Sequence, residues 1–229
     1  MSYYAVARGH NIGIYNFWND CKEQVIGYKG ALYKKFENEK DAEDYILNIG
    51  SSTNDIFENI YNKFNIDEVD YFVYTDGSCL NNGKINNISG IGIYFDENSK
   101  KNVSKILESK FNQTNNSAEL YAIIEAYKII KNDLENNMKI CIYSDSEYSI
   151  KCATSYGEKC LLTKWSKTIP NRELVIELYN IYKNNPNLML KHIKAHTNNK
   201  DIHSIGNANA DKLAYNAIKN YKRDLNKNS

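Results

Sequence analysis

Two buried strands that each lead to an aspartate constrain this sequence most. The stretches "YFVYTDGSC" (71–79) and "ICIYSDSEYSI" (140–150) run apolar and aromatic and then reach Asp76 and Asp145. Such runs are typical of strands in the interior of a sheet. A single aspartate at a strand end is most often a cap for the next helix or turn. Two of them, on strands that α/β topology places side by side, predict an acidic site at one edge of a sheet.

The pattern downstream of residue 70 predicts an α/β fold. Three strands follow one another, and further strands then alternate with helices, which implies a mixed five-stranded sheet with helices on both faces. We expect strands at 71–79, 89–96, 103–111, 139–144 and 188–195, and helices at 115–131, 146–155, 171–184 and 207–220.

Residues 1–49 are expected to form a separate small α+β domain. The stretches "YYAVARG", "GIYNFW" and "ALYKKF" are predicted strands, and "NEKDAEDYILNI" has the apolar spacing of a helix. We expect residues 50–70 to be a linker with a short amphipathic helix at 55–64, because apolar residues recur there at helical spacing. The larger domain then covers 71–222, and residues 223–229 form a C-terminal tail.

Composition limits the partners that this chain can have. The 29 Lys and Arg against 28 Asp and Glu leave a net charge of +1, so a nucleic-acid surface has to be local. The five cysteines form no CxxC pair, which argues against a zinc site. The sequence has no recognisable signal peptide and no apolar run of the roughly 20 residues that a membrane span needs. We therefore expect an intracellular protein, cytoplasmic or nuclear, with no membrane partner.

The predicted strands and helices of the larger domain bring four carboxylates to one site. Asp76 and Asp145 come from the two strands, and Glu119 and Asp211 lie in the first turns of predicted helices. Each of them alone could be a cap or a turn residue. Together they would repel one another strongly unless cations lie between them. Oxygen ligands of this kind select Mg²⁺ or Mn²⁺, and a pair of such ions suits displacement at a phosphate.

Four motifs in order, "YTDGSC", "TNNSAELYAIIEA", "YSDSEYSI" and "GNANADKLA", resemble the catalytic domain of type 1 ribonuclease H over about residues 71–220. The resemblance implies a ribonuclease H-like fold and an endonuclease that hydrolyses the RNA strand of RNA–DNA hybrids. It also implies two Mg²⁺ ions per site, with Mn²⁺ as a substitute, and products with 5′-phosphate and 3′-hydroxyl ends.

The same resemblance implies roles for individual residues. The family's metal-binding carboxylates correspond to Asp76, Glu119, Asp145 and Asp211, and its mobile-loop histidine corresponds to His196 in "IKAHT". His192 is interpreted as an ordinary structural residue, and His203 has no counterpart in the family. The positions that would contact the hybrid, either at RNA 2′-hydroxyls or at DNA phosphates, are Cys79, Thr114, Asn115, Asn116, Tyr156 and Asn171.

The first domain is similar to the hybrid-binding domain of eukaryotic type 1 enzymes and viroplasmin-like proteins, over most of residues 3–46. This resemblance implies that Trp18 and Tyr33 pack on sugars of the DNA strand and that Lys34 and Lys35 contact phosphates. It implies an RNA–DNA hybrid as the ligand, with double-stranded RNA as an alternative. The competing interpretation is a small domain whose aromatic residues form its core and whose basic pair is accidental.

Two other functions stay open at this point. The chain could be a non-catalytic protein that binds hybrid or double-stranded RNA on an inherited nuclease fold, although a protein without activity has no need for four mutually repelling carboxylates. It could also be another nuclease of the same fold, such as a DNA exonuclease or a junction resolvase. We expect the protein to be a monomer.

Overall fold

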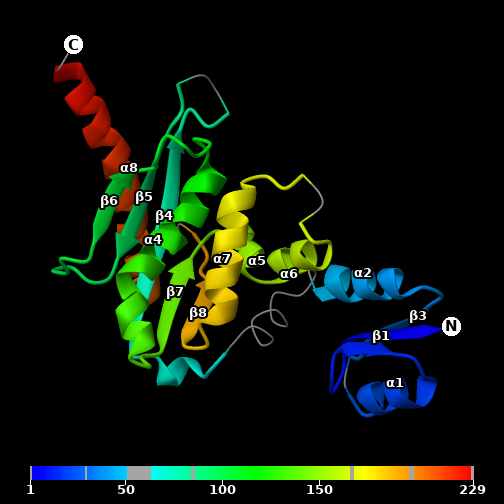
Figure 1. The fold of residues 1–229 in the computed structure, drawn as a ribbon. Coiled ribbons are helices and arrows are strands. Elements are labelled where there is room, and N and C mark those ends of the chain that lie inside the picture. The colour runs from blue at the N-terminus through cyan, green and yellow to red at the C-terminus, as the bar shows by residue number, and fades with distance from the viewer. Residues whose placement is uncertain are drawn as a thin grey trace. The chain divides into compact units, whose positions relative to one another are not determined.

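The computed structural model describes residues 2–28, 30–50, 63–83, 86–165, 168–195 and 199–227. The chain divides into two compact units, Met1–Tyr61 and Asn62–Ser229, and each is described by itself (Figure 1). The helix predicted at 55–64 falls mainly on residues 51–62, which lie outside the described residues. That helix and the exact domain boundaries therefore stay predictions.

The described residues of the N-terminal unit form a three-stranded antiparallel sheet with two helices. The strand order is β2-β1-β3, with β1 at Tyr3–Arg8, β2 at Gly13–Tyr15 and β3 at Leu32–Phe36. Helix α1 spans Trp18–Val25 and α2 spans Glu39–Gly50. The small α+β unit expected from the sequence is confirmed.

One prediction for this unit was wrong. The stretch "GIYNFW" was predicted as a strand through Trp18, but β2 ends at Tyr15 and Trp18 is the first residue of α1. Only two residues of α1, Cys21 and Val25, are buried, and they pack on Val6 of β1. Two apolar residues one turn apart give too weak a helical period to be recognised in eight residues.

The larger unit contains the predicted mixed five-stranded sheet, in the order β6-β5-β4-β7-β8. Strands β4, β5 and β6 pair antiparallel, whereas β4, β7 and β8 pair parallel. The strands span Tyr71–Leu80 (β4), Ile88–Tyr94 (β5), Val103–Ile106 (β6), Ile140–Ser144 (β7) and Leu188–His192 (β8).

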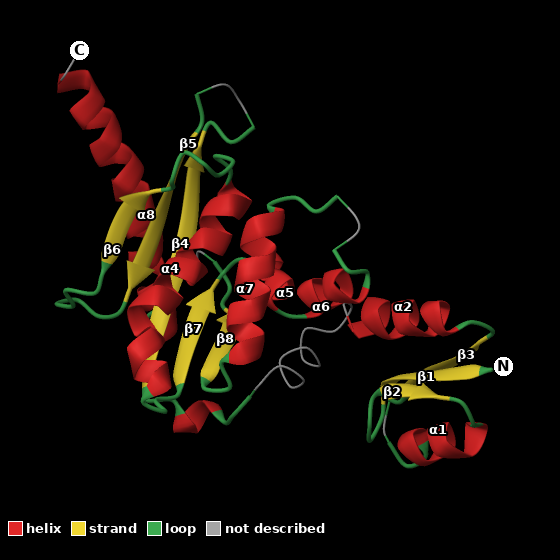
Figure 2. Ribbon diagram, in the orientation of Figure 1, coloured by secondary structure: helices red, strands yellow, loops and turns green. Residues whose placement is uncertain are grey.

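Helices cover both faces of this sheet, with α4 and α7 in front and α8 behind in the view of Figures 1 and 2. The helices span Asn115–Glu135 (α4), Glu147–Ala153 (α5), Ser155–Leu162 (α6), Arg172–Asn184 (α7) and Ile202–Lys227 (α8), after a short 3-10 turn at Ile66–Glu68 (η1). Among the described residues, no helix combines the length and hydrophobicity needed to cross a bilayer.

Two helical predictions need correction. Helix α8 is longer than the predicted 207–220, and residues 223–227, which we assigned to a tail, are helical. Helix α6 was not predicted. It is separate from α5 because Thr154 between them has φ −123° and ψ −111°, which interrupts the helical backbone.

Glycines in β5 allow α8 to lie directly on the sheet. A Cβ atom added at Gly92 would lie 1.9 Å from the carbonyl oxygen of Ala210 and 2.6 Å from the amide nitrogen of Ala214. A Cβ at Gly90 would lie 2.5 Å from the carbonyl oxygen of Ala214. Only residues without a side chain fit at these two positions, so the depth at which α8 packs is set by the strand sequence.

We therefore predict that Gly92→Ala destabilises the larger unit by about 1–3 kcal/mol or more, because the added methyl group meets backbone that cannot move aside easily. Urea denaturation followed by circular dichroism measures the change. Gly13→Ala in the N-terminal unit is the control, since a Cβ there meets only its own neighbour Tyr15 at 3.5 Å or more. Equal stability of the two variants would contradict this account of α8 packing.

Candidate active site

The site lies where β4 continues beyond its parallel neighbour. Strands β4 and β7 pair from Tyr71 opposite Ile140 to Thr75 opposite Ser144, where β7 ends. Asp76 is thus the first residue of β4 with no β7 residue beside it. Asp145 is the first residue after β7. The two aspartates that the sequence places after apolar runs therefore lie at the point where β7 ends and β4 continues alone on that side.

A close contact between β4 and α4 brings a third carboxylate to this opening. A Cβ at Gly77 would lie 2.3 Å from the amide nitrogen of Glu119 and 2.6 Å from the carbonyl carbon of Ala118. Helix α4 begins just upstream, where the Thr114 side chain accepts a hydrogen bond from the Ser117 amide. The first turns of α4 therefore pack on the strand backbone, and Glu119 lies next to Asp76.

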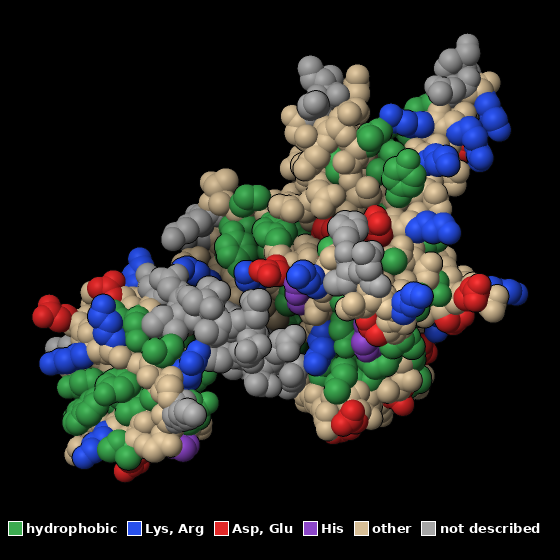
Figure 3. All heavy atoms as spheres, turned by 180° about the vertical axis from the view of Figure 1, so that it is seen from behind, with side chains coloured by type: hydrophobic (Ala, Val, Ile, Leu, Met, Phe, Trp, Pro, Cys, Tyr) green, Lys and Arg blue, Asp and Glu red, His purple; other side chains and the backbone are tan. Residues whose placement is uncertain are grey.

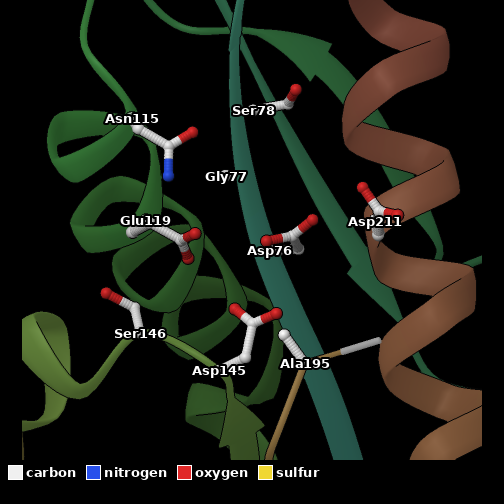
Figure 4. A pocket seen from close by; sticks show the side chains of 9 residues that line it. All are labelled: Asp76, Gly77, Ser78, Asn115, Glu119, Asp145, Ser146, Ala195 and Asp211. Atoms are coloured by element: carbon white, nitrogen blue, oxygen red, sulfur yellow. The ribbon is translucent and has the colours of Figure 1, made fainter. Parts of the chain in front are cut away.

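The carboxylates surround one pocket. One oxygen from each of Asp76, Glu119 and Asp145 lies within 4.8 Å of the others. Asp211, on α8, lies on the other side of the same pocket (Figure 4). The pocket has a volume of about 370 Å³ and is lined by Asp76, Gly77, Ser78, Asn115, Glu119, Asp145, Ser146, Ala195 and Asp211.

The electrostatics of this pocket favour a cation. Asp76 and Glu119 are 6% and 4% exposed. Burial, followed by the charge of Asp145, raises the pKa of Asp76, and burial, followed by the charge of Asp76, raises the pKa of Glu119. The Oε2 atom of Glu119 is buried and has no hydrogen-bond partner among the described residues. Carboxylate oxygens that resist ionisation, one of them without a partner among the described residues, fit a hard divalent cation.

Two residues that the sequence did not identify as functional hold Asp145. The Nδ2 atom of Asn207 donates a hydrogen bond to Oδ2 of Asp145 at 3.2 Å. The Nε2 atom of His192 lies 3.2 Å from the carbonyl oxygen of Asp145. Asn207 precedes Asp211 by four residues in α8, and this spacing was the only signal that could have indicated it.

The predicted loop histidine cannot be placed. His196 lies outside the described residues, although Ala195 lines the pocket. His203 does not line the pocket. Its Nδ1 atom lies 3.1 Å from the hydroxyl of Tyr74, and its ring packs on Phe72 and Tyr143 at centroid distances of 4.8 and 4.3 Å. His203 therefore attaches the start of α8 to the sheet.

Three hydroxyl and amide groups form a chain beside the pocket. The hydroxyls of Thr114 and Ser117 lie 2.7 Å apart, and the Ser117 hydroxyl donates to Oδ1 of Asn171 at 3.0 Å. Asn171 has a left-handed backbone, with φ +54°, at the start of α7. The structure thus brings together Thr114 and Asn171, which were predicted to contact a DNA phosphate.

The other predicted contacts are more dispersed. Asn115 lines the pocket, and Asn116 is exposed next to it at the start of α4. Cys79 is half-buried, and its thiol donates to the carbonyl oxygen of Gln113 at 3.4 Å. Tyr156 is half-buried on α6. Of these residues, only Asn115 lies directly at the carboxylates.

The N-terminal unit exposes an aromatic row. The ring of Trp18 lies 5.6 Å from that of Tyr4 and 5.7 Å from that of Tyr33, and the Nζ atom of Lys35 lies 5.9 Å from the Tyr4 ring. Trp18 and Tyr33 are 40% and 45% exposed. In Figure 3, hydrophobic and basic side chains share the visible surface of this unit.

Lys34 differs from Lys35 in its direction. Lys34 pairs with the buried Ala5, whereas Lys35 pairs with Tyr4, and neighbouring strand residues point to opposite faces. The Nζ atom of Lys34 lies over Phe36 at 5.4 Å. The structure therefore groups Trp18, Tyr33 and Lys35, and it places Lys34 on the other face of the sheet.

Comparison with protein families identifies both units. Residues 68–219 match the family model described as RNase H, which is more than half of the chain. Residues 2–46 match the model described as the ribonuclease H1 N-terminal domain.

Similar proteins cover most of the chain. A ribonuclease H of Schizosaccharomyces pombe is 31% identical over 270 residues, covering 93% of this chain and 96% of the relative. A probable ribonuclease H of Acanthamoeba polyphaga mimivirus is 36% identical over 148 residues, covering 62% and 64%. Ribonuclease H1 of Homo sapiens is 25% identical over 260 residues, covering 93% and 87%.

Solved structures support the fold of the larger unit. The solution structure of the PFV RNase H domain has a TM-score of 0.50 and 22% identity, covering 66% of this chain and 94% of that domain. A prototype foamy virus protease–reverse transcriptase has a TM-score of 0.54 and 24% identity, covering 65% and 21%.

The crowded carboxylates lead to a prediction about stability. Asp76→Asn removes one negative charge from the buried group while it keeps the shape of the side chain, so it should stabilise the metal-free protein. Relief of about 1 kcal/mol would raise the melting temperature by about 2–4 °C. The stabilisation that the wild type gains from added divalent cation should be lost in this variant. Thermal melts in EDTA and in excess cation measure both effects.

The matched control is Asp224→Asn, because Asp224 lies near the end of α8 with a side chain that is 63% exposed. This variant should melt like the wild type under both conditions. An Asp76→Asn variant that melts below the wild type in EDTA, or that keeps the full cation response, would contradict the electrostatic account.

Proposed function

The chain belongs to the ribonuclease H family, whose members hydrolyse the RNA strand of RNA–DNA hybrids, and we propose that the four carboxylates around its pocket perform this reaction. The enzyme is a metal-dependent hydrolase that acts on phosphodiester bonds. The observation that carries the assignment is the group of three carboxylates whose oxygens lie within 4.8 Å of one another, with Oε2 of Glu119 unpartnered in the described part of the chain.

Asp76, Glu119, Asp145 and Asp211 are the residues that would hold the metal. We propose two Mg²⁺ ions, with Mn²⁺ as a substitute, because the donors are all carboxylate oxygens and carry no sulfur or imidazole. When bound, such ions lower the pKa of a water molecule and stabilise negative charge on phosphate oxygens. Buried carboxylates that resist ionisation in the empty site would give up their protons as the cations bind.

The remaining residues of the site orient the substrate. Asn115 and Asn116, at the start of α4, present amides that can donate to and accept from an RNA 2′-hydroxyl. Cys79 and Glu119 are proposed to contact the same RNA strand. Thr114 and Asn171 offer neutral donors for a phosphate of the DNA strand, and Tyr156 is proposed to contact the same strand. His196 is proposed to move a proton during the reaction or to assist product release. The products would carry 5′-phosphate and 3′-hydroxyl ends.

The N-terminal unit is proposed to hold the hybrid. Trp18 and Tyr33 would pack on sugars of the DNA strand, and Lys35 would pair with a phosphate. Lys34 was predicted to make a second phosphate contact, but its position on the other face of the sheet favours Lys35 for this role. Double-stranded RNA is an alternative ligand for this unit, and the protein is proposed to act as a monomer.

A purely binding protein is the second function to test. A chain without catalytic activity would be more stable if one of the buried acids were neutral, since burial and mutual repulsion both disfavour the ionised forms. The presence of all four carboxylates therefore favours the enzyme.

Asp145→Asn provides the direct test of catalysis. The variant removes one charge and one metal ligand, so it should bind the hybrid at least as tightly as the wild type and cleave it at least about 1,000-fold more slowly. The assay uses a hybrid labelled separately on each strand, with double-stranded DNA and double-stranded RNA as controls. Cleavage of the DNA strand by the wild type, or wild-type rates in the variant, would refute the assignment.

A second prediction concerns the aromatic row. Trp18→Ala combined with Lys35→Ala should weaken hybrid binding and reduce the number of successive cuts. The slope of log affinity against log salt should flatten by about 1, the contribution of one phosphate contact. Lys34→Ala is the matched control and should leave the slope unchanged. An equal flattening in Lys34→Ala, or none in the double variant, would contradict the face assigned to the hybrid.

A further inference from the structure

Asn207 is buried against the carboxylate group but is not one of its acids. Its side chain is 5% exposed, and its Nδ2 atom donates to Oδ2 of Asp145 at 3.2 Å. Its own Oδ1 atom is buried and has no partner among the described residues. Asn207 therefore uses its donor on a proposed metal ligand while its acceptor stays unsatisfied.

A role in folding alone does not explain this arrangement. Buried amides in proteins are usually paired at both ends, and an unpaired buried oxygen opposes folding. A fold-stabilising residue at this position would be apolar or fully hydrogen-bonded. The unsatisfied oxygen indicates that the position is constrained by what the Nδ2 atom does to Asp145.

The start of α8 is held in place so that Asn207 reaches Asp145. A Cβ at Gly206 would lie 2.4 Å from ring atoms of Tyr74, so the helix backbone packs directly on that ring. The hydroxyl of the same tyrosine pairs with Nδ1 of His203. These two contacts fix the first turns of α8 on the sheet. Asn207 and Asp211, four residues apart, then lie on one side of the helix, which brings Asp211 to the pocket.

The chemistry of an amide suits this position. A neutral donor fixes the Oδ2 atom of Asp145 and leaves Oδ1 outside this hydrogen bond and available to a cation. A lysine or arginine would donate as well, but its charge would compete with the cation for the carboxylate. A further acid would add to the repulsion among Asp76, Glu119 and Asp145. An asparagine orients the ligand without changing the charge of the site.

We propose that Asn207 is a positioning residue of this enzyme: it holds Asp145 in its metal-binding orientation and links α8, which carries Asp211, to the rest of the carboxylate group. The proposal rests on the proposed function, in which Asp145 is a metal ligand. Partners that orient metal ligands typically change metal affinity or activity by about 10–100-fold when they are removed.

Two substitutions separate the hydrogen bond from packing. Asn207→Leu keeps the number and branching of the side-chain heavy atoms and removes the donor, whereas Asn207→Ser keeps a hydroxyl donor in a smaller volume. The measurements are the Mg²⁺ concentration at half-maximal cleavage rate, the maximal rate, and the rise in melting temperature on adding Mg²⁺ without substrate. Asn207→Leu should raise the half-maximal concentration at least about tenfold and reduce the Mg²⁺-induced rise in melting temperature. Asn207→Ser should lie between the wild type and Asn207→Leu.

Asn209→Ala is the matched control, because Asn209 lies two residues further along α8 and lines a separate pocket with Tyr94 and Lys212. It should retain the wild-type metal dependence. Melting in EDTA shows whether each variant is folded. If Asn207→Leu is unfolded, the comparison of Asn207→Ser with the wild type decides, and an unchanged half-maximal concentration overturns the proposal.

Other outcomes also distinguish this inference from the proposed function. Wild-type metal dependence in folded Asn207→Leu, or a larger defect in Asn207→Ser than in Asn207→Leu, would show that Asn207 acts by packing and would overturn the proposal. Asp145→Asn is assayed in parallel. An active Asp145→Asn would refute the metal-ligand assignment itself, whereas an inactive Asp145→Asn with a normal Asn207→Leu refutes only the positioning role.

Discussion

The contact between the backbone of β4 and the first turns of α4 is the constraint on which the site depends. Any side chain at Gly77 would overlap the backbone of Ala118 and Glu119, so the strand and the helix approach as closely as their main chains allow. This approach places Glu119 beside Asp76, at the level where β7 ends and Asp145 begins the next segment. A methyl group at residue 77 would separate the acids and weaken their shared preference for a cation.

The close packing of these carboxylates also destabilises the folded protein when no cation is bound. Burial and mutual repulsion raise the pKa values of Asp76 and Glu119, so the empty site opposes folding at neutral pH. The surrounding structure offsets this cost. Tyr74, Tyr143, Cys141 and Met189 pack beneath Ala210 of α8, and the glycines of β5 let that helix lie against the sheet. The hydrophobic core and the acidic pocket are thus built from the same strands and the same helix.

Much of the site was predictable from the sequence, because the ends of buried strands and the starts of helices are local features. Asp76 and Asp145 followed apolar runs, and Glu119 lay in a recognisable helix start. Asp211 was expected in the first turn of a helix at 207–220, but α8 begins at Ile202 and Asp211 lies in its third turn. The structure places all four around one pocket. The expected adjacency of the two strands that lead to Asp76 and Asp145 is confirmed, since β4 pairs with β7.

What the sequence did not reveal depends on contacts between distant residues. Helix α1 buries only Cys21 and Val25, which is too little apolar pattern for recognition. Asn207 gains its role from Asp145, 62 residues away, and its spacing of four residues from Asp211 was the only local signal of it. His203, which has no counterpart in the family, pairs with Tyr74, and nothing in the sequence alone indicated this contact. The spacing of residues within one helix or strand does not predict which side chains from distant segments will contact one another.

The central claim is that these carboxylates bind two divalent cations at the place where the RNA strand is cut. The most direct test is anomalous X-ray scattering from Mn²⁺ in crystals with a non-cleavable hybrid. It compares the wild-type protein with the Asp211→Asn variant. The account predicts two strong peaks in the wild type, between Asp76, Glu119, Asp145 and Asp211, and the loss of at least one peak in Asp211→Asn. Peaks elsewhere on the protein, or no peak within bonding distance of Asp76 and Glu119, would contradict it.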